Sequence, residues 1–257
     1  MMTRRTPLGR TQGERDLDSP RSTIEHRALI QSKLFLRLFY ERVYAYFLEE
    51  LMDVPGGALI ELGSGGGFIK QAIPEMRTSD VLDLPELDAR ISATALPFRE
   101  ESISGICLLD VFHHIPNVAR FLKEAERVLR PGGKVVMWEP ANTPFARFLY
   151  QNFHHEPFDP NQREWQLAKG GPLSMANGAL PWIVCARDAI QREQACPTLV
   201  LERMDAVCPL LYLFSGGVSQ RQLLPDRFYS LVALLERLLS PWNGYVGMFY
   251  KIRFKKV

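Results

Sequence analysis

A short apolar run followed by four glycines within five positions constrains this chain more than any other segment. The stretch 58–70 reads ALIELGSGGGFIK. A continuous apolar run is typical of a buried parallel strand. Glycines after such a strand let the backbone turn tightly and approach a ligand, because they have no Cβ. The segment therefore predicts a strand that ends at the binding loop of a nucleotide-like cofactor.

The spacing of the glycines distinguishes between the known loops of this kind. A dinucleotide loop requires a glycine at position 68, where this chain has Phe68, and a phosphate-binding P-loop requires Ser or Thr after Lys70, where it has Gln71. The pattern from Glu61 to Gly67 is E-x-G-x-G-x-G. It resembles the first motif of class I S-adenosylmethionine (SAM)-dependent methyltransferases, in which the loop wraps the methionine part of the cofactor.

The resemblance extends along the chain. Asp80 follows Glu61 by nineteen residues, where the family has a second strand ending in an acidic residue. An ALPF segment at 95–98, a strand with an HH turn at 102–115 and a helix, Pro-Gly-Gly turn and strand at 128–139 follow in the family's order. The resemblance implies an α/β, Rossmann-like doubly wound sheet of seven strands. The sheet is mostly parallel, with one antiparallel strand near the C-terminus and helices on both faces.

The resemblance also implies which residues bind SAM. Asp80 matches the carboxylate that accepts hydrogen bonds from the two ribose hydroxyls. Ser92 stands where the family commonly has Asp against the adenine amino group, and an uncharged acceptor weakens that bond by about tenfold in affinity. The expected cofactor-binding residues are Glu61, Gly63, Ser64, Gly65, Gly67, Asp80, Ser92, Ala93 and Asp110.

The sequence predicts that the chain has three structurally different parts. Residues 1–21 are polar, charged and rich in turn formers, which predicts a disordered basic tail. Residues 22–53 predict a helical cover that begins with a capping box, Ser22-x-x-Glu25, and packs on the sheet or roofs the cofactor site. Residues 54–257 form the catalytic domain, with a substrate-lid insertion at about 142–219.

The insertion begins with a predicted helix and continues as an irregular segment. Thr143 and Pro144 form an N-cap and N1 pair, and the expected inward face consists of Phe145, Phe148, Leu149 and Phe153. Residues 162–182 lack periodicity and are expected to cover the acceptor site. An aromatic acceptor pocket is expected from Trp165, Trp182, Tyr212 and Phe214 with Phe145 and Phe153. The alternative is that these are ordinary core aromatics.

Titratable groups are expected to meet at the carboxyl ends of the strands, where open α/β sheets bind ligands. The candidate general bases are His154, His113 and His114, because imidazole titrates near neutral pH. A packing or helix-entry role is the alternative for the last two. The expected substrate contacts are Glu139, His155 and Trp182. No metal site is expected at 154–159, because adjacent histidines project differently and Pro157 prevents helical spacing.

Composition limits the possible partners. The net charge of +2 is spread along the chain, which does not favour nucleic acid. No apolar stretch reaches ~18 residues, so no membrane span is expected. The four cysteines form no C-x-x-C pair, which indicates free thiols in a reducing compartment and hence a cytoplasmic protein.

The predicted activity is methyl transfer from SAM to a small-molecule or lipid-like acceptor. The stretch 109–112 is not the Asn/Asp-Pro-Pro-aromatic motif of amine-methylating branches, which favours oxygen or carbon acceptors. Two alternatives stay open: a SAM enzyme that catalyses cyclisation or rearrangement, and a SAM-binding regulatory partner without catalysis. The acceptor and the oligomeric state stay unassigned.

Overall fold

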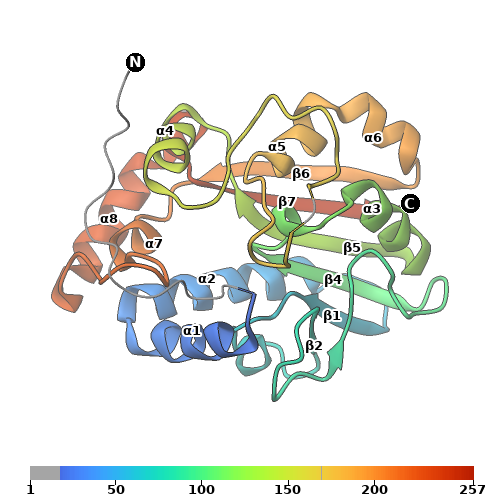
Figure 1. Ribbon diagram of the computed structural model, residues 1–257, viewed down its shortest axis with the longest axis horizontal. Helices are drawn as coiled ribbons and strands as arrows, with labels where there is room; N and C mark the ends of the chain where they lie inside the picture. Colours follow the sequence, from blue (N-terminus) through green and yellow to red (C-terminus); the bar gives the residue numbers. More distant parts are fainter. Residues whose placement is uncertain (1–17, 169) are drawn as a thin grey trace.

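A seven-stranded sheet forms the centre of the computed structural model, which describes residues 18–168 and 170–257 (Figure 1). The strand order is β3-β2-β1-β4-β5-β7-β6, and only β7 runs antiparallel to its neighbours. The predicted fold class is thus confirmed. The strands are β1 (Ala58–Leu62), β2 (Arg77–Asp80), β3 (Ala89–Arg90), β4 (Ile103–Leu109), β5 (Leu129–Pro140), β6 (Leu199–Val207) and β7 (Phe249–Lys256).

Helices cover both faces of this sheet (Figure 1). The α-helices are α1 (Pro20–Ser32), α2 (Leu34–Leu51), α3 (Val118–Val128), α4 (Pro144–Phe153), α5 (Leu180–Trp182), α6 (Ala189–Ala195), α7 (Leu210–Ser215), α8 (Tyr229–Leu239) and α9 (Asn243–Val246). Short 3₁₀ turns are η1 (Ile69–Gln71), η2 (Phe112–His114), η4 (Asp226–Phe228) and η5 (Ser240–Trp242), and η3 (Ile183–Arg187) is a π-helical turn. Within the described ranges, no helix is both long and apolar enough to cross a bilayer.

Side chains of strand β5 pack into two hydrophobic cores, one on each face of the sheet. Val135 and Met137 pack with α3 and α5 on one face, whereas Val136 and Trp138 pack with α2 and α7 on the other. Successive side chains of a strand point to opposite faces, so a continuous apolar run serves both layers. The sheet is therefore buried on both sides and presents its strand ends to ligands.

The N-terminal helix differs from the prediction in two ways. It begins at Pro20, and its N-cap is Ser19, whose Oγ accepts a hydrogen bond from the Ser22 backbone N–H at 3.3 Å. The expected capping box at Ser22 is therefore wrong, because proline at N1 is already set for helix entry one turn earlier. Lys33 is extended and divides the cover into α1 and α2. Most of the predicted tail, residues 1–17, lies outside the described residues.

Helix α4 has the predicted cap and half of the predicted inward face, because Phe145 and Leu149 are partly buried against the core. Thr143 Oγ1 accepts a hydrogen bond from the Ala146 N–H at 3.2 Å. Phe148 and Phe153 are 56% and 74% exposed, whereas Ala146 and Tyr150 are buried. Tyr150 packs in the core, and its hydroxyl donates to the Met248 carbonyl at 2.6 Å, so burial leaves no polar atom without a partner.

The C-terminal half also refines the expected elements. The Pro-Gly-Gly turn lies inside β5, where Gly132 has a φ of 82° and the pairing with β4 shifts register. The predicted strands at the C-terminal end are confirmed as β6 and β7, and β7 lies between β5 and β6. The four cysteines are buried and free.

Candidate cofactor and acceptor site

The glycine loop follows β1 at the point where strand order reverses, between β1 and β4. Gly63 and Gly65 have φ values of 68° and 48°, a backbone conformation that side chains with a Cβ rarely adopt. A Cβ on Gly63 would lie 2.5 Å from a methyl of Val111, in the loop after β4. The loops after β1 and β4 therefore pack directly against each other, at the crevice where doubly wound sheets bind their ligands.

Asp80 ends β2 and ties the glycine loop to the neighbouring strand. Its Oδ2 accepts the Gly65 N–H at 3.0 Å, and its Oδ1 accepts the Leu82 N–H at 3.0 Å. Each carboxylate oxygen has a further lone pair, so these bonds leave acceptor capacity for ribose hydroxyls. Asp80 is therefore placed to shape the loop and to bind a ligand.

Glu61 is a buried carboxylate with spare acceptor capacity. The residue is 2% exposed, and among the described residues its Oε2 has no hydrogen-bond partner. Burial raises the pKa of Glu61 to about 7, and the charge of Asp80 adds to the rise while a hydrogen bond from Ser64 opposes it. A buried acceptor without a partner is costly. A ligand with a cationic group or an N–H donor would remove that cost, and SAM carries such groups.

The N-terminal helices lie against the glycine loop. A Cβ on Gly66 would be 2.8 Å from the backbone nitrogen of Arg27 in α1. The Tyr44 hydroxyl of α2 accepts the Phe68 N–H at 3.0 Å, and a Cβ on Gly67 would lie 2.5 Å from that hydroxyl. The backbone of the loop thus lies directly against α1 and α2.

Ser92 and Ala93 lie beyond β3 on the same rim. Ser92 is exposed, and its Oγ lies 3.0 Å from the Thr94 hydroxyl. The backbone N–H of Ile91 donates to the Asp80 carbonyl at 2.8 Å, which joins this turn to the end of β2. The adenine contact assigned to Ser92 stays a prediction.

Asp110 follows β4 in a strained conformation. Its φ is 60°, which is uncommon outside glycine, and its N–H donates to the Trp138 carbonyl at 2.9 Å. Partial burial raises the pKa of Asp110 to about 6; the negative charge of Glu156 adds to the rise, and the positive charge of His113 opposes it. Backbone strain of this kind concentrates at functional sites. The carboxylate is 42% exposed and faces the recess described below.

Glu139, expected to contact substrate, has a different role in the structure. It is fully buried at the end of β5, and its Oε1 accepts the N–H groups of Val111 and Phe112 at 2.8 Å each. Its Oε2 lies 2.7 Å from His113 Nδ1. Glu139 therefore fixes the turn after β4 and orients His113, and the substrate contact expected of it is not available in this arrangement.

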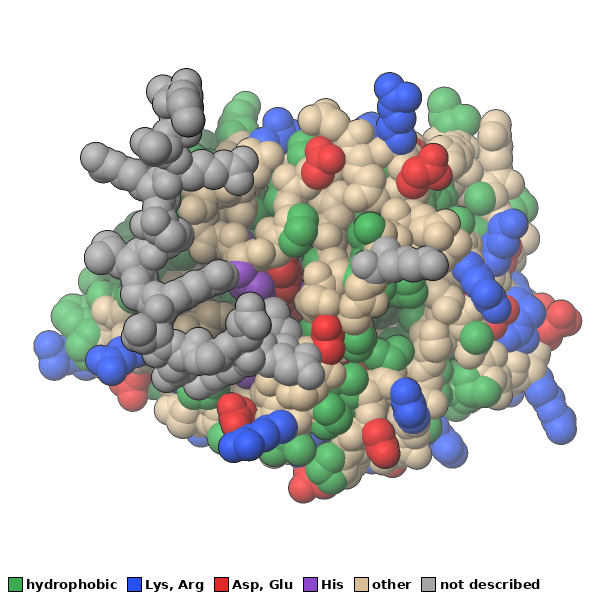
Figure 2. Space-filling view, viewed as in Figure 1, with side chains coloured by type: hydrophobic (Ala, Val, Ile, Leu, Met, Phe, Trp, Pro, Cys, Tyr) green, Lys and Arg blue, Asp and Glu red, His purple; other side chains and the backbone are tan. Residues whose placement is uncertain are grey.

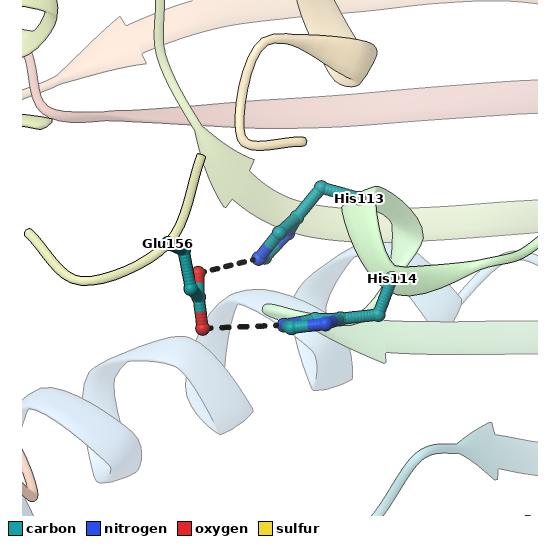
Figure 3. A group of neighbouring side chains, drawn as sticks. All are labelled: His113, His114 and Glu156. Carbon is teal, nitrogen blue, oxygen red and sulfur yellow. Dashed lines mark hydrogen bonds and ion pairs between the residues drawn. The ribbon is translucent and has the colours of Figure 1, made fainter. Parts of the chain in front are cut away.

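Four of the chain's five histidines lie close to the carboxylate of Glu156. Its carboxylate lies 3.3 Å from His113 Nε2 and 3.5 Å from His114 Nε2, and both rings point toward it in Figure 3. His154 and His155 lie 3.8 and 3.6 Å away. In the space-filling view, histidine and acidic side chains meet near the middle of one face (Figure 2).

The availability of each candidate base follows from these contacts. Both ring nitrogens of the buried His113 face carboxylates, which raise its pKa well above the ordinary value although burial opposes the charge. His114 has Nδ1 3.0 Å from the Met175 carbonyl and Nε2 toward Glu156. His154 is 32% exposed, and burial lowers its pKa, so it is neutral at pH 7 as a base must be.

A small recess lies beside these groups. Its volume is about 10 Å³, roughly the space of one water molecule. Its lining includes Asp110, His154, Glu156, Tyr150, Tyr212 and Phe249. Asp110 contributes from the end of β4, whereas the others come from segments after β5.

The structure does not assemble the expected aromatic pocket. Only Tyr212 of the six predicted aromatics lines the recess. Trp165 is buried in the core, Trp182 packs against that core, and Phe153 is exposed. Tyr150 and Phe249, which also line the recess, were not predicted from the sequence, although the alternation around Phe249 predicted its strand.

Part of the chain is similar to known proteins. Residues 69–137 match the family described as Methyltransferase domain. The chain is 28% identical over 126 residues to a demethylmenaquinone methyltransferase of Symbiobacterium thermophilum, covering 48% of this chain and 49% of that protein. It is 46% identical over 52 residues to a phthiotriol/phenolphthiotriol dimycocerosates methyltransferase of Mycobacterium ulcerans, covering 20% and 19%. The matched part thus spans half or less of these relatives' lengths.

A solved structure shares the fold. Geranyl diphosphate C-methyltransferase from Streptomyces coelicolor, solved with Mg²⁺, geranyl diphosphate and S-adenosyl-L-homocysteine, superposes with a TM-score of 0.54. The sequence identity is 11%, over 86% of this chain and 81% of that one. The likeness establishes the architecture of the sheet and its helices.

Proposed function

We propose that this chain, which carries a class I SAM-dependent methyltransferase domain, transfers a methyl group from SAM to a small-molecule or lipid-like acceptor, at oxygen or carbon. The proposal rests on one observation: residues suited to bind the cofactor and residues suited to act on an acceptor both lie at the carboxyl ends of the strands. Glu61, the glycine loop and Asp80 suit the cofactor, and Asp110 with His154 lines the adjoining recess. The names of the menaquinone and dimycocerosate relatives support an apolar acceptor.

This chain's own residues supply binding and orientation. Asp80 would accept hydrogen bonds from the ribose hydroxyls of SAM. Glu61 would accept a hydrogen bond from the cationic methionine part of SAM. SAM supplies a methyl group on a positively charged sulfur, which is already an activated leaving group. Holding an acceptor in line with that methyl contributes roughly 7–11 kcal/mol, more than the ~3–5 kcal/mol typical of a general base.

His154 is the residue we assign to proton removal from an acceptor hydroxyl or acidic carbon. It lines the recess and is neutral near pH 7, whereas His113 has both nitrogens engaged. Asp110 lies on the same recess at the end of β4. Because both groups line one recess, they support an acceptor site there.

The 142–219 segment would act as the cover of the acceptor site, and α1–α2 as the cover of the cofactor site. The recess has room for about one water molecule, so a larger acceptor requires the 154–178 segment to move outward. Loop closure of this type excludes water from the reacting groups. The cover is therefore part of the proposed mechanism.

Calorimetry with SAM tests cofactor binding. We expect binding by the wild-type chain and at least about tenfold weaker binding by Asp80→Ala, because charged hydrogen bonds are lost. Absence of binding by the wild type would overturn the proposal. Incubation of candidate extracts with methyl-labelled SAM, followed by mass spectrometry, then identifies the acceptor. A rearranged product without label would indicate non-methylating chemistry instead, and SAM binding without any product would favour a regulatory partner.

A further inference from the structure

The hydrogen bonds of His113 and His114 fix the orientation of both rings. His113 Nδ1 lies 2.7 Å from the buried Glu139 carboxylate, and His114 Nδ1 lies 3.0 Å from the Met175 carbonyl. Both partners are acceptors, so each ring carries its proton on Nδ1. Nε2 is then the second nitrogen of each ring. Both Nε2 atoms face the same carboxylate, Glu156 (Figure 3).

This convergence is unfavourable unless protons on the Nε2 atoms or a bound cation lie between the rings and the carboxylate. With protons on Nδ1 alone, two nitrogen lone pairs would point at the lone pairs of Glu156, which is repulsive. His113 is fully buried and His114 is 12% exposed, so water does little to relieve that repulsion. Either two additional protons or one bound cation must occupy the gap.

The distances also fit one cation in place of the protons. The Glu156 oxygens lie 3.3 Å from His113 Nε2 and 3.5 Å from His114 Nε2. Charge-assisted N–H···O bonds are shorter, roughly 2.7–2.9 Å. Ligand atoms about 2.0–2.1 Å from one tetrahedral zinc ion are roughly 3.3–3.4 Å apart. The ligand atoms of all three residues lie within 4.8 Å of one another.

The outer contacts have the form found around protein metal sites. Metal-binding histidines usually donate their second ring N–H to a carboxylate or a backbone carbonyl. Glu139 and the Met175 carbonyl occupy those two positions here. Two imidazoles and one carboxylate, with further coordination positions open, suit Zn²⁺ or Fe²⁺ rather than Mg²⁺.

We propose that His113, His114 and Glu156 form a binding site for one divalent transition-metal ion, with Zn²⁺ as the ion to test. The ligands come from η2 and from the segment after α4, so the ion would also fix that segment over the strand ends. Because Glu156 lines the recess, an open coordination position would lie toward the acceptor. An acceptor oxygen bound there would be held and made more acidic, a role that rests on the proposed methyl transfer.

The test uses the full chain stripped of metal by a chelator and titrated with Zn²⁺ against a chromophoric competitor. We expect one equivalent of Zn²⁺ to bind, and millimolar Mg²⁺ not to displace it. Glu156→Gln and His114→Ala should each lower the Zn²⁺ affinity at least tenfold. The matched control is Glu164→Gln, the same change at an exposed carboxylate of the same segment, which should leave Zn²⁺ affinity unchanged.

Two results would overturn the site: no stoichiometric Zn²⁺ binding by the wild type, or binding that survives both substitutions. Melting of each stripped variant, with and without Zn²⁺, separates loss of the ligands from loss of the fold. Only the wild type and the control should gain melting temperature when Zn²⁺ is added. SAM calorimetry on the stripped wild type distinguishes the two proposals, because intact SAM binding without Zn²⁺ binding overturns the metal site alone.

Discussion

The surroundings of Glu61 favour the protonated, neutral form of its side chain at acidic pH. Its ordinary pKa of 4.5 rises to about 7 in the folded chain, first because of burial. Between these values the unfolded chain has released the proton while the folded chain still holds it. The free energy of unfolding therefore falls as pH rises from about 4.5 to about 7, by on the order of 3 kcal/mol from this residue.

Glu61→Gln removes this titration while keeping the side-chain shape. We expect the difference in unfolding free energy between Glu61→Gln and wild type to shift in favour of the variant as pH rises to 7, and then to level off. Denaturant unfolding at pH 5, 6, 7 and 8 measures it. Parallel profiles for the two proteins would show that the carboxylate titrates normally.

His154 is the residue whose removal should affect the chemical step. With the acceptor identified, His154→Ala should lower kcat by about 10²–10⁴-fold, because a positioned base is lost. The dissociation constant for SAM should stay within about twofold, since His154 lies on the acceptor side. Added imidazole should restore part of the rate. An unchanged kcat, or a loss that imidazole does not relieve, would assign the proton elsewhere.

At the scale of elements, the glycine loop depends on the helices that lie over it. In Gly67→Ala, the added Cβ would lie 2.5 Å from the Tyr44 hydroxyl and 2.9 Å from the Ser64 carbonyl oxygen. We expect a loss of roughly 1–3 kcal/mol in stability and weaker SAM binding. Gly56→Ala is the control, because nothing lies within 4 Å of its Cβ. Equal effects of the two substitutions in thermal melts and SAM calorimetry would contradict a close loop–helix contact.

The strands could be predicted from the sequence because their signals are local. The apolar run before Gly63 and the alternation along Phe249–Lys256 both specify a strand without knowledge of any partner. The inward face of α4 could be predicted only in part, since Phe145 and Leu149 pack against the core but Phe148 and Phe153 do not. Phe148 and Phe153 are more apolar than Tyr150, yet Tyr150 is the buried residue, and the Met248 carbonyl, 98 residues away, accepts a hydrogen bond from its hydroxyl.

The candidate site also has one part that local sequence signals predict and one part that they do not. The cofactor side lies in one short stretch and its neighbour strand, so the spacing of Glu61, the glycines and Asp80 indicated it. The cluster around Glu156 joins residues 43 positions apart, His113 and Glu156 among them. Neither the spacing of the histidine pairs nor Pro157 predicts that contact, because it depends on how the segment after α4 folds back over the sheet.

At the scale of the whole molecule, the residue just before the N-cap of α1 is joined to the proposed cover of the acceptor side. Asp18 Oδ1 accepts the N–H groups of Leu173 and Ser174 at 2.6 and 3.0 Å, across 155 positions of the chain. The backbone and hydroxyl hydrogen bonds of this segment lower the pKa of Asp18, although burial opposes them. Since α1 also contacts the glycine loop at Gly66, one element touches both halves of the site.

Asp18→Ala should therefore loosen the acceptor cover and leave the sheet intact. Hydrogen bonds to a charged group contribute roughly 1.5–3 kcal/mol, so the Leu173 and Ser174 amides should exchange with solvent at least about tenfold faster. Hydrogen-exchange mass spectrometry measures this on peptides that span 170–178. Glu25→Ala is the control, because its ion pair with Arg21 lies on the surface of α1 and away from the cover. Faster exchange in strand β4 as well as in the cover would indicate global destabilisation. Unchanged exchange at 173–174 would mean that Asp18 does not hold the cover in solution.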